Sequence, residues 1–414
     1  MTAEIICVGT ELLLGNILNK NAQFLAIQLA NLGIPHYYQT VVGDNSQRLK
    51  QVIEIAVERS QFLIFTGGLG PTPDDLTTET LADFFGVPLL ENPEIIADIA
   101  HKYAQRGREM TPSNRKQALI PVGAEVLPNL AGTAPGIIWQ VAGVTIFTFP
   151  GVPSEMQRMW QETAVPFLKS QGFGKEIIYS QTLKFWGIAE SALAEKVAGF
   201  LNLSNPTVAP YASQGEVKLR ISAKAESVAA ARQLIAPVAA ELQQIGGLNY
   251  YGIDNETLGS VVGQLLLQRR ETLSVAESCT GGKLGEMLTD VAGSSSYFLG
   301  GVISYDNSVK ISLLGVEPED LIHLGAVSAK VAEQMAIGVQ TRLATTWGLS
   351  ITGIAGPGGD TTTKPVGLVY IGIAGPNSEV QSFEYRFGER SRSLIRHLSA
   401  CTALDHLRRE LLRK

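Results

Sequence analysis

The sequence predicts an α/β protein in which two α/β halves are joined by a small α+β segment. Short apolar runs alternate with helical patterns up to about residue 170 and again after Thr257, as in βαβ units. Between these halves, VKLRISAKA alternates apolar and polar residues like an antiparallel strand. The chain has 414 residues, which is too long for one ordinary domain.

Composition narrows the class of protein. Hydrophobic residues make up 45% and charged residues 17%, which excludes a disordered or collagen-like chain. Cys7, Cys279 and Cys401 lie far apart, which excludes a disulfide framework or zinc finger and indicates a reducing cytoplasm. No apolar run reaches the ~18 residues of a membrane helix, and the start lacks signal-peptide features. A net charge of −6 argues against a nucleic-acid partner, and we expect a homodimer on general grounds.

The first half is expected to form a parallel sheet with helices packed on it. Each predicted strand is followed at once by a turn that contains glycine. The strands are Glu4–Val8, Gln39–Val42, Phe62–Phe65 and Val144–Phe149, and the helices are Asn21–Leu32 and Thr77–Phe85.

The rest of the chain is expected to hold a middle segment, in which QTLKFWGIAESALAEKVAGF forms a strand and then a helix, and a second α/β domain. The predicted helices are Ser227–Gln244, Leu258–Arg269, Lys283–Leu288, Ser328–Thr341 and a C-terminal helix from Arg392. The predicted strands of the second domain are LSVAES, GVISY, LSITG, GLVYIGIAG and VQSFEYRF.

The glycine loops of the first half predict a phosphate-and-metal site. Ligands of open α/β sheets bind beyond the carboxyl ends of the strands, where glycine lets backbone N–H groups approach phosphate oxygens. Carboxylates at the same edge can hold a divalent cation. The glycines are Gly9, Gly67, Gly68 and Gly70, and the carboxylates are those of Asp44, Asp74, Asp75 and Glu155. The alternative is that the glycines form tight turns and the carboxylates cap helices.

The N-terminal motifs VGTELLLGNILNKN, FTGGLGPTPDDLT, NLAGTAPG and FPGVPSEM resemble those of CinA, the competence/damage-inducible protein A family. The resemblance implies a molybdopterin-binding-like domain that hydrolyses ADP-ribose with a divalent metal ion (Mg, Mn or Co). Asp44 and Asp75 are our preferred metal ligands, because relatives carry acids on the equivalent loops. The loops that would cradle the pyrophosphate contribute Gly9, Thr10, Glu11, Gly67, Gly68 and Gly70.

In the second half, AESCTGG places Ser278 between a strand and a helix opened by glycine. A helix N-terminus stabilises an alkoxide or oxyanion, and a serine there needs a base. Lys310 in SYDNSVK is a candidate if the two strands are neighbours, and the alternative is that it is a surface lysine on an amphipathic helix. Cys279 is an alternative nucleophile, but a cysteine in such a place is more often a small buried hydrophobe.

The loop ITGIAGPGGD is expected to wrap a phosphate or complete an oxyanion hole through residues such as Gly353 and Gly356, or to be a tight crossover. Near the start of the last helix, GERSRSLIR offers guanidinium groups suited to a phosphate monoester. The alternative is that these arginines are solvated helix charges. The three arginines are Arg390, Arg392 and Arg396.

AESCTGG, SYDNSVK and ITGIAGPGG resemble the CinA C-terminal domain, a nicotinamide mononucleotide (NMN) deamidase. The resemblance implies that Ser278 is the nucleophile, Lys310 its base and Tyr305 an assisting group, with no cofactor. It also implies substrate contacts from Thr352 and an arginine, for which we prefer Arg392. N–H groups of the TGG turn, formed by Thr280, Gly281 and Gly282, or of the GIAGP loop would hold the oxyanion.

Together these inferences predict a bifunctional enzyme that acts on NMN and ADP-ribose. The expected domains are residues 1–172, a KH-like segment at 173–252 and an amidase domain at 253–414. The middle segment reads GIAE at its helix junction and lacks the GxxG clamp that KH domains use on nucleic acid. The alternatives are a first half that binds a nucleotide or pterin without catalysis, and a competence- or damage-associated role.

Overall fold

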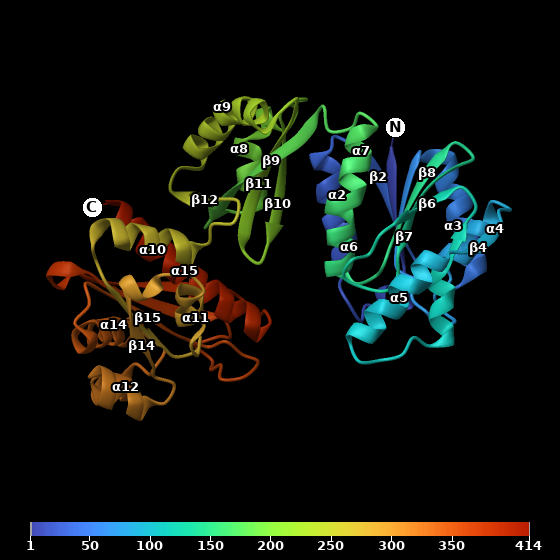
Figure 1. Ribbon diagram of the computed structural model, residues 1–414. Coiled ribbons are helices and arrows are strands. Elements are labelled where there is room, and N and C mark those ends of the chain that lie inside the picture. The colour runs from blue at the N-terminus through green and yellow to red at the C-terminus, as the bar shows by residue number, and fades with distance from the viewer. Residues whose placement is uncertain (1, 414) are drawn as a thin grey trace. The chain divides into compact units, whose positions relative to one another are not determined.

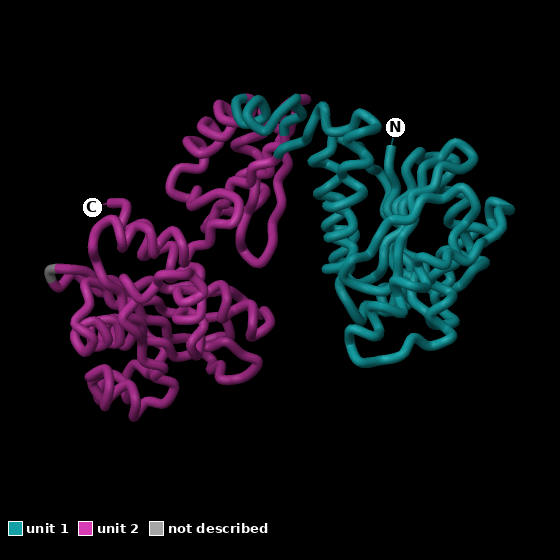
Figure 2. The backbone as a smooth tube through the Cα atoms, in the orientation of Figure 1, with its two compact units in different colours: residues 1–179, 223–233 teal, residues 180–222, 234–414 magenta. Residues whose placement is uncertain are grey.

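The computed structural model describes residues 2–413 and divides into two compact units (Figures 1 and 2). Unit 1 comprises Met1–Tyr179 and Ala223–Gln233. Unit 2 comprises Ser180–Ser222 and Leu234–Lys414. Each unit has its own hydrophobic core.

A six-stranded mixed sheet forms the centre of unit 1, in the order β2-β1-β3-β8-β7-β6. Strands β2, β1, β3 and β8 are parallel, whereas β7 and β6 are antiparallel to their neighbours. The strands are β1 (Ala3–Val8), β2 (His36–Val42), β3 (Phe62–Thr66), β6 (Ala124–Leu127), β7 (Gly136–Val141) and β8 (Val144–Phe149). A separate antiparallel pair consists of β4 (Leu89–Glu91) and β5 (Leu119–Pro121).

Helices cover both faces of this sheet because the strands are apolar on both sides. Ile5 belongs to a core with α2, α6 and α7, and its neighbour Ile6 belongs to a second core with α3, α4 and α5. The helices are α1 (Thr10–Leu13), α2 (Lys20–Asn31), α3 (Ser46–Arg59), α4 (Thr77–Phe84), α5 (Pro93–Gln105), α6 (Pro153–Met159) and α7 (Val165–Ser170). Shorter helical segments are η1 (Pro112–Ala118) and the π-helical turn η2 (Trp160–Ala164).

A four-stranded sheet in the order β10-β11-β9-β12 belongs mostly to unit 2, with the first residues of β9 and the last residues of β11 assigned to unit 1. Strand β11 is buried at every second position on its central part, as the alternation in VKLRISAKA predicted. The strands are β9 (Ile177–Trp186), β10 (Thr207–Ser213), β11 (Glu216–Ala225) and β12 (Tyr250–Ile253). The accompanying helices are α8 (Glu190–Lys196), η3 (Ala198–Phe200), α9 (Val228–Gly246) and η4 (Gly247–Asn249).

The second sheet of unit 2 has the order β14-β13-β15-β16-β17. Its first three strands are parallel and the last two antiparallel. The strands are β13 (Leu273–Glu277), β14 (Phe298–Ile303), β15 (Trp347–Gly353), β16 (Leu368–Ala374) and β17 (Val380–Arg386). The helices are α10 (Leu258–Arg269), α11 (Lys283–Thr289), α12 (Asn307–Leu314), α13 (Pro318–His323), α14 (Ala329–Leu343) and α15 (Arg392–Arg413), with η5 (Ser294–Ser296) and η6 (Pro376–Ser378).

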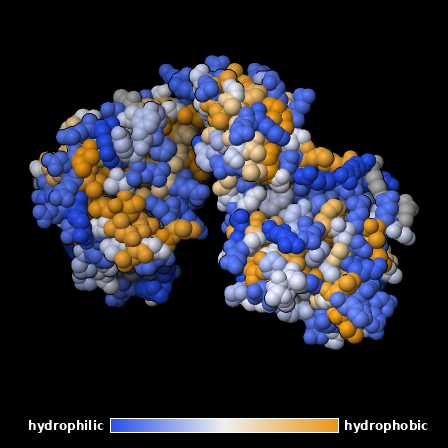
Figure 3. Space-filling view, turned by 180° about the vertical axis from the view of Figure 1, so that it is seen from behind, coloured by the Kyte–Doolittle hydropathy of each residue, from blue (hydrophilic) through white to orange (hydrophobic). Residues whose placement is uncertain are grey.

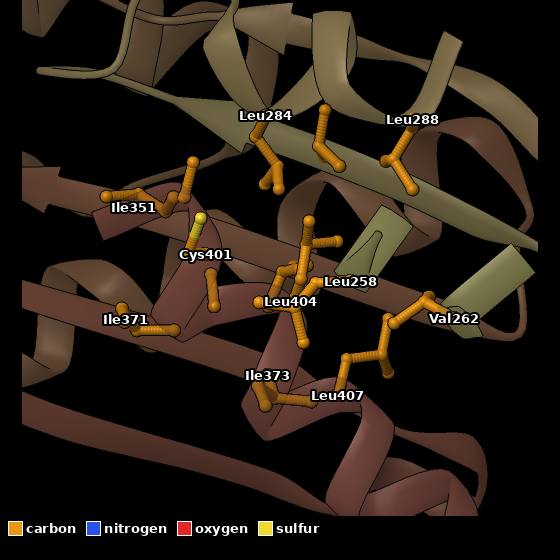
Figure 4. Close-up of a cluster of buried hydrophobic side chains, with 14 of the residues drawn as sticks. Leu258, Val262, Leu284, Leu288, Ile351, Ile371, Ile373, Cys401, Leu404 and Leu407 are labelled. Carbon is orange, nitrogen blue, oxygen red and sulfur yellow. The ribbon is translucent and has the colours of Figure 1, made fainter. Parts of the chain in front are cut away.

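The core of this second sheet is closed by the C-terminal helix. Figure 4 shows Leu404 and Leu407 of α15 among side chains from α10, α11, β15 and β16. All of these side chains are at least 90% buried. The helix therefore brings its N-terminal end, with its arginines, to a fixed place on the sheet.

The expected α/β order is confirmed, with local corrections. Tyr305 does not end a strand, because β14 stops at Ile303 and Tyr305 lies in the following loop. The expected turn GTELLLG contains the short helix α1. Within residues 2–413, no helix has the length and apolarity needed to cross a membrane. On the face drawn in Figure 3, apolar and polar residues are interspersed.

Candidate functional site

A cavity of about 390 Å³ lies at the carboxyl ends of β1, β3 and β8 in unit 1. It is built from the loops that follow these strands, together with the loop after β2. The structure thus brings the predicted glycines and carboxylates to one place. Its lining includes Gly9, Glu11, Asp44, Gly67, Gly68, Gly70, Asp74, Asp75 and Glu155.

Carboxylates dominate this cavity, which has five among its lining residues and no lysine or arginine there. The Thr10 N–H donates to Asp44 Oδ2 at 2.8 Å, and the Asp44 N–H donates to Thr10 Oγ1 at 3.2 Å. Asp75 Oδ2 accepts the N–H of Thr72 at 2.9 Å. A hydrogen bond from Thr72 also holds the pKa of Asp74 below its usual value. The loops therefore hold these carboxylates in defined orientations.

Glu155, from α6, is positioned by a residue that sequence reasoning missed. The Asn129 side-chain amide donates to Glu155 Oε2 at 2.7 Å and to the Ala134 carbonyl at 2.9 Å. The side-chain oxygen Oδ1 of Asn129 accepts the Gly132 N–H at 2.8 Å. Asn129 is almost completely buried, so it ties the loop to the acid. The sequence did carry a signal for Asn129, because this residue opens the motif NLAGTAPG.

Two glycines in or beside the cavity allow carboxylates to approach the backbone. A Cβ atom on Gly70 would lie 2.4 Å from Asp75 Oδ2, and one on Gly132 would lie 2.1 Å from Glu155 Oε2. The Gly9 and Gly67 N–H groups donate to the Val42 and Phe149 carbonyls, which corrects the expectation that they face phosphate. The Thr10 N–H is likewise bound to Asp44.

The N–H groups of three consecutive residues of the glycine loop, Gly68, Leu69 and Gly70, have no hydrogen-bond partner within residues 2–413. The carboxylates and unpaired N–H groups of the cavity fit a divalent cation that is bound together with a phosphate ligand. Mg²⁺ typically takes one or two protein carboxylates and completes its shell with phosphate and water. Within the same residues, no three His, Cys, Asp or Glu side chains cluster tightly enough to form a metal site by themselves.

The second candidate site lies at the carboxyl ends of β13, β14 and β15 in unit 2. The Ser278 N–H donates to the Ile351 carbonyl at 2.9 Å, and the Ser304 N–H donates to the Glu277 carbonyl at 2.8 Å. Ser278 is therefore placed between the ends of the two neighbouring strands. The expectation that the Ser278 and Lys310 strands are neighbours is confirmed.

Lys310 is 99% buried in α12, which excludes the alternative of a surface lysine. Its Nζ donates to the Ser304 carbonyl at 2.7 Å and to the Tyr305 carbonyl at 3.1 Å. Burial lowers the pKa of Lys310, although Asp306 and Cys279 oppose the shift. A neutral amine keeps two N–H hydrogens for these carbonyls and has its lone pair left to accept a proton. In the described part of the chain, no hydrogen bond joins Lys310 Nζ to Ser278 Oγ.

Arg392 reaches this site from the start of α15. Its Nη2 donates to Tyr305 Oη at 3.0 Å and its Nη1 donates to the Gly356 carbonyl at 2.8 Å. Arg396 binds the Thr280 carbonyl through Nε at 3.1 Å, whereas Arg390 binds the Phe387 carbonyl outside the site. Arg392 is thus the arginine that joins the two motif loops.

Thr352 lies at the expected strand end, but its hydroxyl donates to the Ala326 carbonyl at 2.8 Å and is completely buried. Gly353 closes β15, where a Cβ atom would lie 2.7 Å from Val369 Cγ2. Thr352 therefore stabilises the segment that contains Ala326.

Glu277 occupies the helix end that was expected to hold an oxyanion. Its buried carboxylate accepts the N–H groups of Gly282 at 3.0 Å, Leu284 at 3.1 Å and Gly285 at 2.8 Å. The Gly281 N–H donates to the Ser278 carbonyl. The expectation that Gly281 and Gly282 present free donors is therefore corrected. Glu277 was missed although it stands in the motif AES.

Two buried hydroxyls beside Ser278 have no hydrogen-bond partner within the described residues, Thr280 Oγ1 and Ser304 Oγ. Both residues are completely buried. Buried hydroxyls are normally paired, so two unpaired ones at a strand edge favour a polar ligand there. Thr280 was predicted as a substrate contact, whereas Ser304, the first residue of SYDNSVK, was missed.

Cys279 packs in the hydrophobic core next to Ser278. Burial raises the pKa of its thiol to about 12. Since the thiolate is the reactive form, this environment disfavours a cysteine nucleophile. It fits the interpretation of Cys279 as a small buried hydrophobe.

Three family models match consecutive stretches of the chain. Residues 4–170 match the probable molybdopterin binding domain, residues 180–252 the damage-inducible protein CinA KH domain, and residues 255–411 the CinA C-terminal domain. These matches confirm the predicted order of a molybdopterin-binding-like domain, a small KH-like segment and a CinA domain.

Full-length relatives are similar over the whole chain. CinA-like proteins of Nostoc punctiforme and Trichormus variabilis are 75% and 74% identical over 414 residues, which cover all of this chain and of theirs. A solved competence/damage inducible protein of Agrobacterium tumefaciens is 39% identical, covers 37% of this chain and 93% of its own, and has a TM-score of 0.37. The chain belongs to the CinA-like protein family.

Proposed function

We propose that the C-terminal domain hydrolyses the carboxamide of NMN to give nicotinic acid mononucleotide and ammonia. The observation that carries the proposal is the arrangement of Ser278, Lys310, Tyr305 and Arg392 at one sheet edge. Serine with a buried lysine is a known variant of the nucleophile and base pair. The guanidinium of Arg392 suits the phosphate of a mononucleotide.

In the proposed mechanism, neutral Lys310 accepts the proton of Ser278 while Oγ bonds to the carboxamide carbon. The C–N bond then breaks, and Lys310 returns the proton to the departing ammonia. Water attacks the acyl-enzyme, gives a proton to Lys310 and releases the carboxylate, after which Ser278 is restored. The unpaired hydroxyls of Thr280 and Ser304 are available to orient the carboxamide.

Ammonia release from NMN tests this proposal. Ser278→Ala and Lys310→Ala are each expected to lower kcat by at least about 100-fold, as for other catalytic proton acceptors and nucleophiles. Ser308→Ala is a matched control, since Ser308 lies on the same helix as Lys310 and, among residues 2–413, its side chain bonds Asp306 alone. Wild-type turnover by a folded Ser278→Ala or Lys310→Ala variant would refute the assignment.

For the N-terminal domain we propose hydrolysis of ADP-ribose to AMP and ribose 5-phosphate with a divalent metal ion. The supporting observation is a cavity lined by five carboxylates and no basic residue, which requires a cation before it admits a pyrophosphate. Asp44 and Asp75 would hold the metal ion, which neutralises phosphate charge and polarises the phosphorus. The unpaired N–H groups of Gly68 and Gly70 are available to phosphate oxygens.

AMP formation from ADP-ribose, with and without Mg²⁺, Mn²⁺ or Co²⁺, tests this second activity. Asp44→Asn and Asp75→Asn are expected to lower metal-dependent turnover by about tenfold or more. Asp83→Asn serves as the control, because Asp83 is an exposed partner of Lys50. Binding of ADP-ribose without turnover at any metal concentration would favour a non-catalytic first domain instead.

A further inference from the structure

A second cavity, of about 480 Å³, lies within unit 2 and is separate from the site around Ser278. Its walls come from the end of β9, the turn between β10 and β11, the end of β17 and the helix α15. The volume is typical of pockets that take small ligands.

The walls of this cavity are preformed. Arg408 is buried, pairs with Asp405 at 2.6 Å and donates to the carbonyls of Leu248 and Tyr250. These contacts fix α15 against the segment before β12. At the opposite wall, a Cβ atom on Gly215 would lie 2.5 Å from Leu398, so the β10–β11 turn lies directly on α15. A ligand would therefore enter a rigid recess.

One side of the cavity is aromatic. Tyr385 and Phe387 stand two residues apart at the end of β17, and their rings are parallel within 8° at a centroid distance of 5.6 Å. Trp186 completes this wall. The Tyr385 hydroxyl is paired with His406 Nε2 at 2.6 Å, and burial lowers the pKa of His406 to about 4, so this pair is uncharged at pH 7. Rings held in this way suit a planar heteroaromatic group.

The charged side of the cavity is basic. Arg390 uses its Nε to bind the Phe387 carbonyl, and Arg409 uses its Nε to bind Asp405 at 2.7 Å. Within residues 2–413 the Nη groups of both arginines have no hydrogen-bond partner. Asp405, the acid of the lining, is already paired with Arg408 and Arg409. The unused donors match an anion such as a phosphate monoester.

We propose that this cavity binds a nucleoside 5′-monophosphate, with its base against Tyr385 and Phe387 and its phosphate on Arg390 and Arg409. The two halves of the cavity correspond to the two halves of such a ligand. The proposal does not depend on the proposed catalytic activities, because it concerns residues outside both candidate catalytic sites.

Calorimetric titration of the full chain with AMP tests the proposal. The titration is done in EDTA, so that no divalent metal ion supports AMP binding in unit 1. Wild type is expected to bind AMP more tightly than adenosine or inorganic phosphate. The single variant Arg390→Gln and the double variant Arg390→Gln/Arg409→Gln are expected to weaken AMP binding by about tenfold or more. The reason is that each substitution removes a charge-assisted hydrogen bond to the phosphate. Phe387→Ala is expected to weaken AMP and adenosine equally, since it removes the aromatic contact.

Arg413→Gln is the matched control, because Arg413 lies on α15, pairs with Glu410 at the surface and does not line the cavity. AMP binding that Arg392→Gln abolishes would belong to the Ser278 site, whereas binding in this cavity should persist in Arg392→Gln and be lost in Arg390→Gln. Arg390 is exposed and its side chain bonds one carbonyl, so we expect Arg390→Gln to fold. This single variant still tests the proposal if the double variant does not fold. No AMP binding by wild type, or equal binding by wild type and Arg390→Gln, would overturn the proposal.

Discussion

Lys310 Nζ lies 2.7 Å from the Ser304 carbonyl oxygen, at the point where β14 has ended beside Ser278. This contact and the one to the Tyr305 carbonyl hold a buried amine at the edge of the sheet. Because burial disfavours the charged form, the fold favours the neutral amine that the proposed mechanism requires of Lys310.

The first prediction concerns the pH dependence of NMN deamidation. Since burial lowers the pKa of Lys310, the neutral base is populated below the ordinary lysine pKa of about 10.4. The value of kcat/KM should rise with pH through the lowered pKa and level off before pH ~10. Lys310→Arg should lose at least about 100-fold, because a guanidinium is not deprotonated. A rise that continues past pH ~10 in wild type would contradict a lowered pKa.

The second prediction separates Cys279 from Ser278. Burial raises the pKa of the Cys279 thiol to about 12, so the folded protein should resist alkylation by iodoacetamide at pH 8. Cys279→Ala should retain NMN turnover within about threefold of wild type, as expected for a small core substitution. Rapid alkylation of the native protein with parallel loss of activity would instead favour a cysteine nucleophile.

The third prediction distinguishes two neighbouring arginines. Arg392 contacts Tyr305 and the Gly356 carbonyl, whereas Arg390 contacts the Phe387 carbonyl. Arg392→Gln should raise KM for NMN by about tenfold or more, since it removes a charge-assisted contact to phosphate. Arg390→Gln should leave this KM unchanged. Steady-state ammonia release measures both, and a larger effect of Arg390→Gln would reverse our assignment.

The fourth prediction concerns the stability role of Glu277. Its buried carboxylate accepts three backbone N–H groups around the start of α11. Glu277→Gln should reduce the free energy of unfolding by about 1.5–3 kcal/mol, the usual effect of hydrogen bonds to a charged group. Urea denaturation followed by circular dichroism measures this change.

Glu286→Gln on the same helix is the control for Glu277, because Glu286 is exposed and pairs with Lys283 at 3.3 Å. Its effect should stay within about 0.5 kcal/mol. An equal effect of the two substitutions would mean that Glu277 does not hold the turn.

Many residues that lie together at the two candidate sites could be predicted from the sequence, because strand ends and glycine turns leave a local signal. Ser278 and Lys310 could be paired on the assumption of neighbouring strands, and that assumption is correct. Glu277 and Asn129 could not be assigned roles in this way. Their importance depends on partners brought close by the chain's turns, such as Gly285 and Glu155, and not on their own residue type.

The sequence by itself determined the α/β alternation, the three-part order of the chain and the loops that carry glycine and carboxylates, because periodicity and turn chemistry are local properties. Tertiary structure alone decided that Lys310 is buried, that Glu277 occupies the helix end and that Arg392 joins Tyr305 to Gly356. It also created the cavity at Arg390 and Arg409, since its walls come from strands and a helix far apart in the chain. Burial and through-space contact depend on packing, which no single segment encodes.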